Sequence, residues 1–521
     1  MNREDALKRL HAHEGMWDLV VIGGGATGVA VAMDAAIRGL SVVLVEQSDF
    51  GKGTSSRSTK LVHGGVRYLQ QGNVTLVRDA LRERTLLRAN APHLVHDLPF
   101  LIPCRSWWQR FFYGVGLKVY DFLAVGNSFG SSRNLSVDET MQAVPVLSRS
   151  QIKGGVLYHD GQFDDARLLI SMVRTGYDAG ACLLNYMRVT SLIRDQDQAI
   201  SGVSVRDVES GEEFSIKGRA VVNATGPFSD TIRSMDDANQ ETMIAPSQGV
   251  HLVLPRALYP GDTAIIVPKT SDGRVIFIIP WHEHAIVGTT DTPIDKACLE
   301  PKPQAEEIHF LLATAADYLE RPPEHRDVLG YFTGVRPLVK GDKSARTASL
   351  SRDHVIRLSD NGLITIAGGK WTTVRKMAED CVDKAVQLSR LPAQPCNTQN
   401  YKLHGASDQV VETSERAVYG ADLVHLQQLE HDQPKLAKTL SAVFSITAAQ
   451  VIWAARQEMA RTVEDVLARR TRALFLDARA AVAMAPEVAA LLAEELGRDA
   501  EWCDMQVKEF NQLAKNYLPE S

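Results

Sequence analysis

The sequence predicts an α/β protein with a Rossmann-like nucleotide-binding domain, an antiparallel β-sheet domain and a C-terminal all-helical domain. Three observations lead to this prediction. Residues 17–46 read as a complete β-α-β unit, and residues 244–336 contain short β-rich runs broken by Pro and Gly. Beyond Pro395 the chain is rich in Ala, Leu, Glu and Arg with helical periodicity. The 521 residues are enough for about three domains of ordinary size.

The first strand of the β-α-β unit leads into a glycine-rich turn. Residues 20–22 are an apolar β-branched run, which suits a buried parallel strand, and Gly23, Gly25 and Gly28 complete the pattern G-x-G-x-x-G. The first glycine makes a tight turn, the second lets a pyrophosphate approach the backbone, and the third lets the helix pack on the strand. The helix expected over residues 26–38 offers free N–H groups and a positive dipole end to phosphates. This spacing predicts a dinucleotide site.

An acidic residue completes the unit. A second buried strand is expected over residues 41–45, and Glu46 follows it about 20 residues beyond the glycines, where a carboxylate accepts hydrogen bonds from a ribose diol. An acid at this place favours an unphosphorylated ribose, as in FAD or NAD, over NADP. The unit by itself leaves FAD and NAD open.

The segment after Glu46 is denser in Gly, Ser and Thr than a surface connection needs. Small residues allow close approach to a cofactor, and the hydroxyls of Thr54, Ser55 and Ser56 can donate to phosphate oxygens. A flexible loop is the alternative reading.

Bulk properties narrow the class of protein. The net charge of −6 argues against a general nucleic-acid binder. The six cysteines are scattered without C-x-x-C spacing, so the sequence suggests neither a disulfide framework nor a zinc or iron–sulfur site. His282, Glu283 and His284 are read as a polar hairpin loop and not as metal ligands. The charged N-terminus resembles no signal peptide, and no segment has the roughly 18 apolar residues of a membrane span.

An ordered series of motifs carries a family resemblance. The motifs are TSSRSTKLVHGGVRYL at 54–69, YHDGQFDDARL at 158–168, NATGPF at 223–228, PWHEHAIVGTTD at 280–291, FTGVRPL at 332–338, GGKWTTVRKMAED at 368–380 and VEDVLARRTRALFLD at 463–477. Together with the opening fingerprint they resemble the FAD-dependent, respiratory glycerol-3-phosphate dehydrogenases of the D-amino-acid-oxidase-like flavoprotein group. The resemblance implies FAD as cofactor, oxidation of sn-glycerol 3-phosphate to dihydroxyacetone phosphate by hydride transfer from C2 to flavin N5, and a membrane quinone as electron acceptor. It also implies a cytoplasmic protein attached to the inner face of the cell membrane.

Most of the expected FAD contacts lie in the motifs at 54–69, 223–228 and 368–380. NATGPF reads as a buried strand that runs into a turn near the pyrophosphate, and the turn after residues 362–366 directs backbone N–H groups toward the flavin ring. No Cys or His stands in a recognisable attachment context, which favours a non-covalent flavin. The expected contacts are Gly23, Gly25, Gly28, Glu46, Thr54, Ser55, Ser56, Lys60, His63, Gly64, Gly65, Thr225, Gly226, Gly368, Gly369, Lys370 and Thr372.

Three arginines are the expected substrate ligands. Arg336 stands between a glycine and a proline, at an expected rigid corner, and a guanidinium there suits a phosphate. We expect Arg336 and Arg352 to hold the phosphate and Arg67, next to Tyr68 as a further substrate contact, to orient the polar end of the substrate. His251, on a strand, is the expected general base. Lys370 is its rival, and a satisfied core histidine is the ordinary alternative for such a position.

Two other segments leave alternatives open. Residues 107–122 mix Trp, Phe and Tyr with Arg and Lys, which suits the headgroup boundary of a bilayer and equally an amphipathic helix packed on the protein. The resemblance favours monotopic membrane contact, and a homodimer stays open. Arg469, Arg470 and Arg472 are read as a solvated helix face, with a lipid-facing or partner patch as the alternative.

The domain prediction follows from these segments. The chain divides into the following parts: a first FAD segment at 1–105, an aromatic insertion at 106–150, a second FAD segment at 151–243, a substrate-binding sheet at 244–336, a third FAD segment at 337–392 and a helical domain at 396–521. Two alternatives to the dehydrogenase remain: a soluble glycerol-3-phosphate oxidase that releases hydrogen peroxide, and a non-enzymatic FAD-binding protein.

Overall fold

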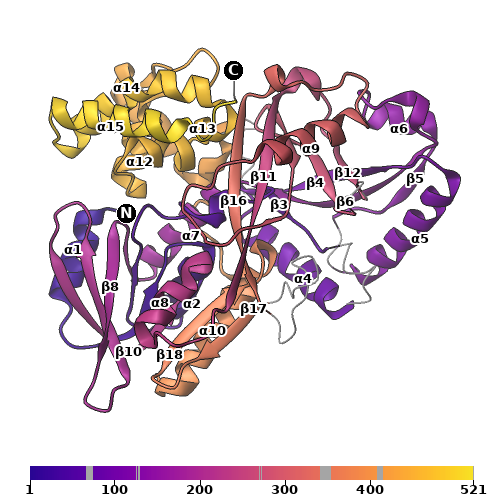
Figure 1. Ribbon diagram of the computed structural model, residues 1–521. Helices are drawn as coiled ribbons and strands as arrows, with labels where there is room; N and C mark the ends of the chain where they lie inside the picture. Colours follow the sequence, from indigo (N-terminus) through magenta and orange to yellow (C-terminus); the bar gives the residue numbers. More distant parts are fainter. Residues whose placement is uncertain are drawn as a thin grey trace.

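The computed structural model of the protein describes residues 1–65, 74–124, 126, 129–268, 270, 273–340, 354–407 and 415–519. Two sheets and a C-terminal group of helices make up the described chain (Figure 1). In Figure 1 the first sheet with its helices lies at the lower left, the C-terminal helices lie above it, and the second sheet extends to the right. The fold class predicted from the sequence is therefore the observed one.

The first sheet has a parallel core in the order β18-β10-β1-β2-β7. Its strands are continuous apolar runs, as expected of strands that are covered on both faces. The strands of this sheet are β1 (Trp17–Ile22), β2 (Val42–Val45), β7 (Cys182–Leu184), β8 (Met187–Arg194), β9 (Ile200–Asp207), β10 (Glu213–Asn223), β17 (His354–Leu358) and β18 (Leu363–Gly368). Helices beside it are α1 (Arg3–Ala12), α2 (Ala26–Ile37), α7 (Asp165–Asp178), α8 (Ser229–Asp236) and α10 (Val374–Ser389).

Strand β10 pairs with different neighbours along its length. Its first half pairs antiparallel with β9, and its second half pairs parallel with β1. Because β10 ends at Asn223, the turn that follows lies beside the glycine-rich turn after β1. Asp164 caps α7 by accepting a hydrogen bond from the Arg167 N–H at 3.0 Å.

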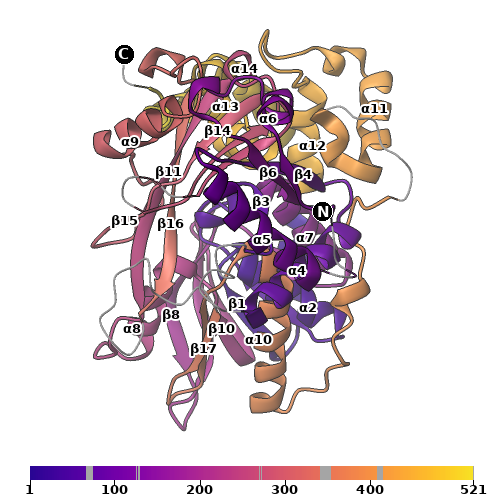
Figure 2. The same ribbon diagram turned by 90° about the vertical axis from the view of Figure 1, so that its right-hand side faces the viewer.

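The second sheet draws strands from four of the predicted segments. Strands β4 and β6 lie in it although the sequence analysis assigned them to the FAD segments, because their long ladder continues into β12. Its members are β3 (Leu61–Val62), β4 (Val95–Pro103), β5 (Arg133–Leu135), β6 (Gly155–Phe163), β11 (Ile244–Pro255), β12 (Ala264–Val267), β13 (Ile276–Trp281), β14 (His284–Gly288), β15 (Thr292–Pro293) and β16 (Gly330–Val339). Helices near it are α4 (Val74–Asn90), α5 (Trp107–Leu123), α6 (Val137–Ala143) and α9 (Ala305–Ala316). Figure 2 shows β11 and β16 extending from the C-terminal helices toward the first sheet.

The C-terminal helices are more broken than the sequence predicts. The helical periodicity beyond Pro395 continues through residues 448–470, but α12 (Ala448–Glu458) ends where Met459 adopts a left-handed φ of 55°, and a short π-helical turn follows at Asp465–Arg470. The remaining helices are α11 (Leu423–Asp432), α13 (Ala473–Leu476), α14 (Ala478–Leu496) and α15 (Ala500–Ala514). No helix in the described ranges is long and apolar enough to cross a membrane.

The arginines in this turn and just after it are buried. The sequence predictions of a solvated helix face, or of a patch for lipid or a partner, were therefore wrong. Arg469 and Arg470 donate to the carboxylate of Asp49 at 2.5 to 2.9 Å, and Arg472 donates to Asp165 at 3.0 Å. Burial alone raises the pKa of Asp49, but Arg470 and Arg469 outweigh it and lower the pKa to about 2. These ion pairs connect the C-terminal helices to the first sheet.

Candidate active site

One cavity of about 1000 Å³ lies between the two sheets. The first sheet contributes the turns after β1, β10 and β18, and the second sheet contributes side chains of β4, β6, β11, β12, β13 and β16. This volume is at the upper end of ligand sites, about 300–1,000 Å³. The carboxyl ends of parallel strands are where an open α/β sheet binds its ligands.

The glycines after β1 leave no room for side chains. Gly23 has a φ of +109°, which favours glycine, and a Cβ on Gly28 would lie 2.0 Å from the Gly23 carbonyl oxygen. Helix α2 therefore packs directly against the turn. Its N-cap is Gly25, which has no capping side chain, so the positive end of the helix faces the cavity.

Glu46 stands at the end of β2 and also lines the cavity. Its carboxylate accepts hydrogen bonds from the N–H groups of Gly24, at 2.6 Å, and Ser48, at 2.9 Å. Burial raises the pKa of Glu46, although the two N–H groups oppose this effect. A buried carboxylate fixed beside the N-terminus of a helix fits the ribose and pyrophosphate of a dinucleotide.

Two of the three hydroxyl residues that the sequence predicted as FAD contacts in the loop after Glu46 line the cavity. Thr54 and Ser55 line the cavity, but the Thr54 hydroxyl donates to the Val335 carbonyl and Ser55 Oγ accepts from the Ala26 N–H at 2.9 Å. Ser55 thus caps α2 from outside the helix, and its hydroxyl is already engaged.

Ser56, Lys60 and Gly64, which the sequence also predicted as FAD contacts, do not line the cavity. Lys60 is fully buried, and its Nζ donates to Asp165 at 2.7 Å and to the Ser56 carbonyl at 2.8 Å. Burial lowers the pKa of Lys60 to about 7, against the attraction of Asp165. Gly64 has no space for a Cβ, which would lie 2.3 Å from the Tyr120 hydroxyl. Gly28 is likewise outside the lining and acts through packing.

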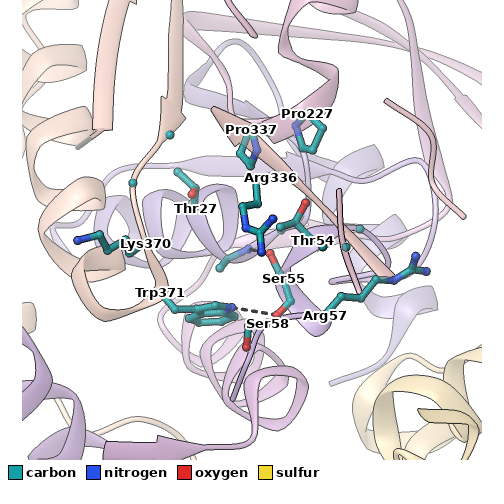
Figure 3. Close-up of a pocket in the computed structure, with 18 of the residues that line it drawn as sticks. Thr27, Thr54, Ser55, Arg57, Ser58, Pro227, Arg336, Pro337, Lys370 and Trp371 are labelled. Atoms are coloured by element: carbon teal, nitrogen blue, oxygen red, sulfur yellow. Dashed lines mark hydrogen bonds between the residues drawn. The ribbon is translucent and has the colours of Figure 1, made fainter. Parts of the chain in front are cut away.

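The turn after β18 forms another wall. Gly368 and Gly369 have φ values of 79° and 75°, and Trp371 Nε1 donates to the Ser55 carbonyl at 2.9 Å (Figure 3). Thr372 Oγ1 accepts from the His63 N–H at 3.2 Å, so this turn is fixed to the loop of the first segment. A short 3-10 turn at Trp371–Thr373 follows, and helix α10 starts at Val374.

Further expected contacts lie in this lining. Thr225 donates through Oγ1 to its neighbour Asn223 at 2.7 Å, and a Cβ on Gly226 would meet no atom within 4 Å. The predicted contacts that line the cavity are Gly23, Gly25, Glu46, Thr54, Ser55, His63, Gly65, Thr225, Gly226, Gly368, Gly369, Lys370 and Thr372.

Arg336 lines the cavity from the interior of β16, and not from the rigid corner that the sequence predicted. Pro337 fits within this strand because its cross-strand partner is Pro246, so neither residue of the pair has a backbone N–H to donate. Arg336 Nη1 lies 3.3 Å from Asp291, and Nη2 donates to the Thr290 carbonyl at 2.8 Å. Its side chain is 26% exposed, and Figure 3 shows it pointing into the cavity near Thr54, on the other side from Lys370.

His251 lies on β11 with its ring stacked on Phe332 at 4.5 Å between centroids. Its Nε2 lies 3.0 Å from Thr59 Oγ1, and a Cβ on Gly288 would lie 2.2 Å from the ring. Burial, with Lys60 and Arg336 nearby, holds the pKa of His251 well below 6.5. The imidazole is therefore neutral at neutral pH and can accept a proton.

Thr59 and Asp291 also line the cavity, where they contact His251 and Arg336 respectively, but the sequence did not single them out. Each lies inside a quoted motif, but their partners are 192 and 45 residues away, so no local pattern could reveal the contacts. The predicted residues Arg67, Tyr68 and Arg352 lie outside the described residues.

The described residues contain no group of three or more His, Cys, Asp or Glu side chains that could hold a metal ion. His282 and Glu283 form the tight turn between β13 and β14, both with positive φ, in agreement with the hairpin reading. The His282 Nε2 lies 3.1 Å from Asp164.

Comparisons with known proteins cover nearly the whole chain. A family model described as "FAD dependent oxidoreductase" matches residues 18–375, and one described as "C-terminal domain of alpha-glycerophosphate oxidase" matches residues 366–503. The chain is 41% identical to the Mus musculus protein named "Glycerol-3-phosphate dehydrogenase, mitochondrial", over 96% of this chain and 73% of the mouse protein. A mitochondrial glycerol-3-phosphate dehydrogenase of Arabidopsis thaliana is 40% identical, over 96% of this chain and 86% of the Arabidopsis protein.

Solved structures agree with these matches. The X-ray structure of the glycerol-3-phosphate dehydrogenase from Bacillus halodurans, complexed with FAD, gives a TM-score of 0.81 at 31% identity and covers 99% of this chain and 97% of that chain. The FAD-bound L-α-glycerophosphate oxidase of Mycoplasma pneumoniae shares the fold, with a TM-score of 0.57 at 18% identity over 75% of this chain and 99% of that chain.

Proposed function

The chain belongs to the family of FAD-dependent glycerol-3-phosphate dehydrogenases, and from this membership we propose that it oxidises sn-glycerol 3-phosphate to dihydroxyacetone phosphate. The family resemblance, the fold class and FAD as the cofactor, all predicted from the sequence, are confirmed. The observation that carries the proposal is that Arg336 and His251 line the same cavity as the dinucleotide fingerprint.

The residues around the cavity fit FAD. Glu46 and the N-terminus of α2 would hold the ribose and the pyrophosphate, the turn at 224–226 would close over the phosphates, and the turn at 368–372 would face the ring. When bound, FAD supplies the acceptor for the hydride that leaves C2 of the substrate.

Arg336 is the proposed phosphate ligand. Its guanidinium is already held by Asp291 and by backbone carbonyls, so its position is fixed before the substrate binds. A phosphate can take over the longer contacts, those at 3.2 to 3.3 Å, because a doubly charged anion is the stronger acceptor. Arg352 and Arg67 remain proposed further ligands.

His251 is the proposed general base. The substrate C2 hydroxyl loses a proton as the hydride leaves, and a neutral imidazole at Nε2 can take it. Its lowered pKa keeps the ring unprotonated at neutral pH, and its stacking on Phe332 together with the Thr59 contact orients it. Lys370, which also lines the cavity, remains the rival base.

A membrane quinone is the proposed electron acceptor, and α5 is the proposed membrane contact. The outer face of α5 exposes Trp107 (71%) and Phe122 (76%), while Leu117 and Tyr120 on its inner face are buried. The other large apolar side chains exposed on this face are Trp108, Phe111, Phe112, Val115 and Val119. Half-exposed aromatic residues with Arg105 and Lys118 beside them suit the headgroup region of a bilayer.

Anaerobic reduction of the flavin tests the activity. We expect glycerol 3-phosphate to bleach the flavin absorbance of the holoenzyme under nitrogen, whereas glycerol, amino acids and 2-hydroxy acids leave it oxidised. A flavin that glycerol 3-phosphate does not reduce would favour a non-enzymatic FAD-binding protein. If oxygen rapidly reoxidises the reduced flavin and forms peroxide, whereas quinone does not reoxidise it, the protein would be an oxidase.

A further inference from the structure

The imidazole of His251 is oriented by a residue that does not line the cavity. It stacks on Phe332 with centroids 4.5 Å apart and planes 11° from parallel, while its Nε2 meets Thr59. Phe332 is 1% exposed and lies outside the cavity lining, so whatever fixes the Phe332 ring also fixes the imidazole. A catalytic group that is misplaced by about 1 Å can cost about a hundredfold in rate. The supports of the two contacts therefore bear on the reaction.

The support of the stacking contact comes from the C-terminal helices. The ring of Phe475, on α13, stacks on Phe332 at 5.3 Å and 10°, and on Tyr517 at 5.4 Å and 14°. The imidazole is thus the first of four rings in series. A Cβ on Gly330 would lie 3.3 Å from the Phe475 carbonyl oxygen, so α13 lies directly beside β16 (Figure 1).

The support of the Thr59 contact comes from the same place in the chain. Arg472, three residues before Phe475, donates from Nη2 to Asp165 at 3.0 Å. Asp165 also accepts from the Ser58 N–H at 3.0 Å and from Lys60 Nζ at 2.7 Å. Both neighbours of Thr59 are therefore held by one carboxylate, and Arg472 anchors that carboxylate.

The two supports pack against each other. The Cζ atom of Arg472 lies 4.7 Å from the Phe475 centroid, and Lys60 Nζ lies 4.8 Å from the centroid of Phe332 and 5.9 Å from that of Phe475. All four side chains are at most 2% exposed, and a cation is strongly attracted to a ring face when water is excluded. The arginine, the lysine and the two rings therefore form one packed unit around the contacts of the imidazole.

We propose that Arg472 and Phe475 of the C-terminal helical domain are positioning residues for His251. The inference rests on the proposed function, which makes His251 the general base. Neither residue lines the cavity, so they act on the reaction only through the loop and the ring that orient the imidazole. The helical domain thus serves the active site, although none of its described residues lines the cavity.

The test is a double-mutant cycle that combines Phe475→Leu with His251→Gln. It measures the rate at which glycerol 3-phosphate reduces the flavin of the holoenzyme under nitrogen. With His251 present, Phe475→Leu should lower this rate about tenfold, whereas in the His251→Gln background it should change the rate less than about twofold, because no base is left to misplace. The Kd for glycerol 3-phosphate and the FAD content should stay at the wild-type level, because the ring contacts neither ligand.

Phe510→Leu is the matched control. Phe510 lies on α15, is 2% exposed and belongs to the same hydrophobic core as Phe475, so its loss disturbs packing to a similar degree. Its rate of flavin reduction should equal that of the wild type. Arg472→Met is a second test variant, in which Asp165 keeps Lys60 as its counter-charge. It should show the same loss as Phe475→Leu and the same dependence on His251.

Equal losses in Phe475→Leu and Phe510→Leu would overturn the inference, because the effect would then come from packing of the domain as a whole. A loss by the same factor with and without His251 would do so as well. A wild-type rate in His251→Gln would instead refute the proposed base, and the inference with it, while the substrate assignment stands. A wild-type flavin that glycerol 3-phosphate does not reduce would refute the proposed function itself, and the inference would fall with it.

Discussion

The Oγ1 atom of Thr59 lies 3.0 Å from Nε2 of His251, the nitrogen that we propose accepts the substrate proton. The next residue, Lys60, has a left-handed φ of 64° and is held by Asp165 at 2.7 Å. The fixed Lys60 therefore holds Thr59 in place, and Thr59 in turn orients the imidazole.

Replacing Thr59 by Val should remove this orientation without changing the shape of the side chain. Loss of one hydrogen bond of about 1 kcal/mol predicts a decrease in kcat of about five- to tenfold. Thr59→Ser keeps the hydroxyl and should keep most of the wild-type kcat. Steady-state kinetics with glycerol 3-phosphate separate kcat from KM. If the Val and Ser variants behave alike, the hydroxyl has no positioning role.

Arg336→Ala should raise the KM for glycerol 3-phosphate strongly and leave FAD bound. A charged hydrogen bond to phosphate contributes about 1.5–3 kcal/mol, which corresponds to roughly 10- to 150-fold in KM. The flavin spectrum after gel filtration shows whether FAD is retained. Arg326→Ala, which removes an exposed arginine, serves as control, and an unchanged KM in Arg336→Ala excludes the phosphate-binding role.

Gly28→Ala should prevent normal FAD binding. The added Cβ would lie 2.0 Å from the Gly23 carbonyl oxygen, so α2 must move away from the turn that receives the pyrophosphate. We expect protein purified with little flavin, measured by the ratio of absorbance at 450 and 280 nm. The control Gly116→Ala lies on a helix with nothing within 4 Å of the new Cβ, and it should keep its flavin.

Asp49→Asn should destabilise the protein, because it leaves Arg469 and Arg470 buried without their shared carboxylate. Breaking such a buried pair costs about 3–5 kcal/mol, and the melting temperature at pH 7 should fall accordingly. Asp138→Asn, which breaks an exposed pair with Arg149, should have almost no effect.

The same pair predicts a pH dependence with a defined sign. The pKa of Asp49 is about 2 in the folded protein and about 3.9 in an unfolded chain. The ionised carboxylate therefore stabilises the fold above pH 4, and this stabilisation is lost as the pH falls from about 4 toward 2. The difference in melting temperature between wild type and Asp49→Asn should narrow over that range. A difference that is constant with pH would contradict the lowered pKa.

Substitution of Trp107 and Trp108 by Ala should weaken binding to anionic lipid vesicles, because both indoles are exposed on α5. Co-sedimentation with vesicles measures the bound fraction, and bleaching by glycerol 3-phosphate in solution should be unchanged. Trp502→Ala, on the C-terminal helix α15, is the control. If the double variant instead changes the oligomeric state and not vesicle binding, this face is an interface between copies of the chain.

The sequence by itself determined the β-α-β unit, the His282–Glu283 hairpin and the family. Each of these is encoded by residues close together in the chain: glycines at fixed spacing, polar residues between two apolar runs, and motifs that keep their order. Local geometry is enough to read them, because turns and helix ends depend on neighbours within a few residues.

Only the tertiary structure decided which polar residues face the cavity. The sequence predicted Lys60 as an FAD contact and Arg470 as part of a solvated helix face, yet Asp165 and Asp49, 105 and 421 residues away, pair with them in the interior. Thr59 reaches His251 in the same way, and Phe100 and Tyr158 line one cavity with Phe277 only because β4 and β6 join β12 and β13 in one sheet. Burial and long-range pairing depend on how distant segments meet, and no local pattern of residues records that.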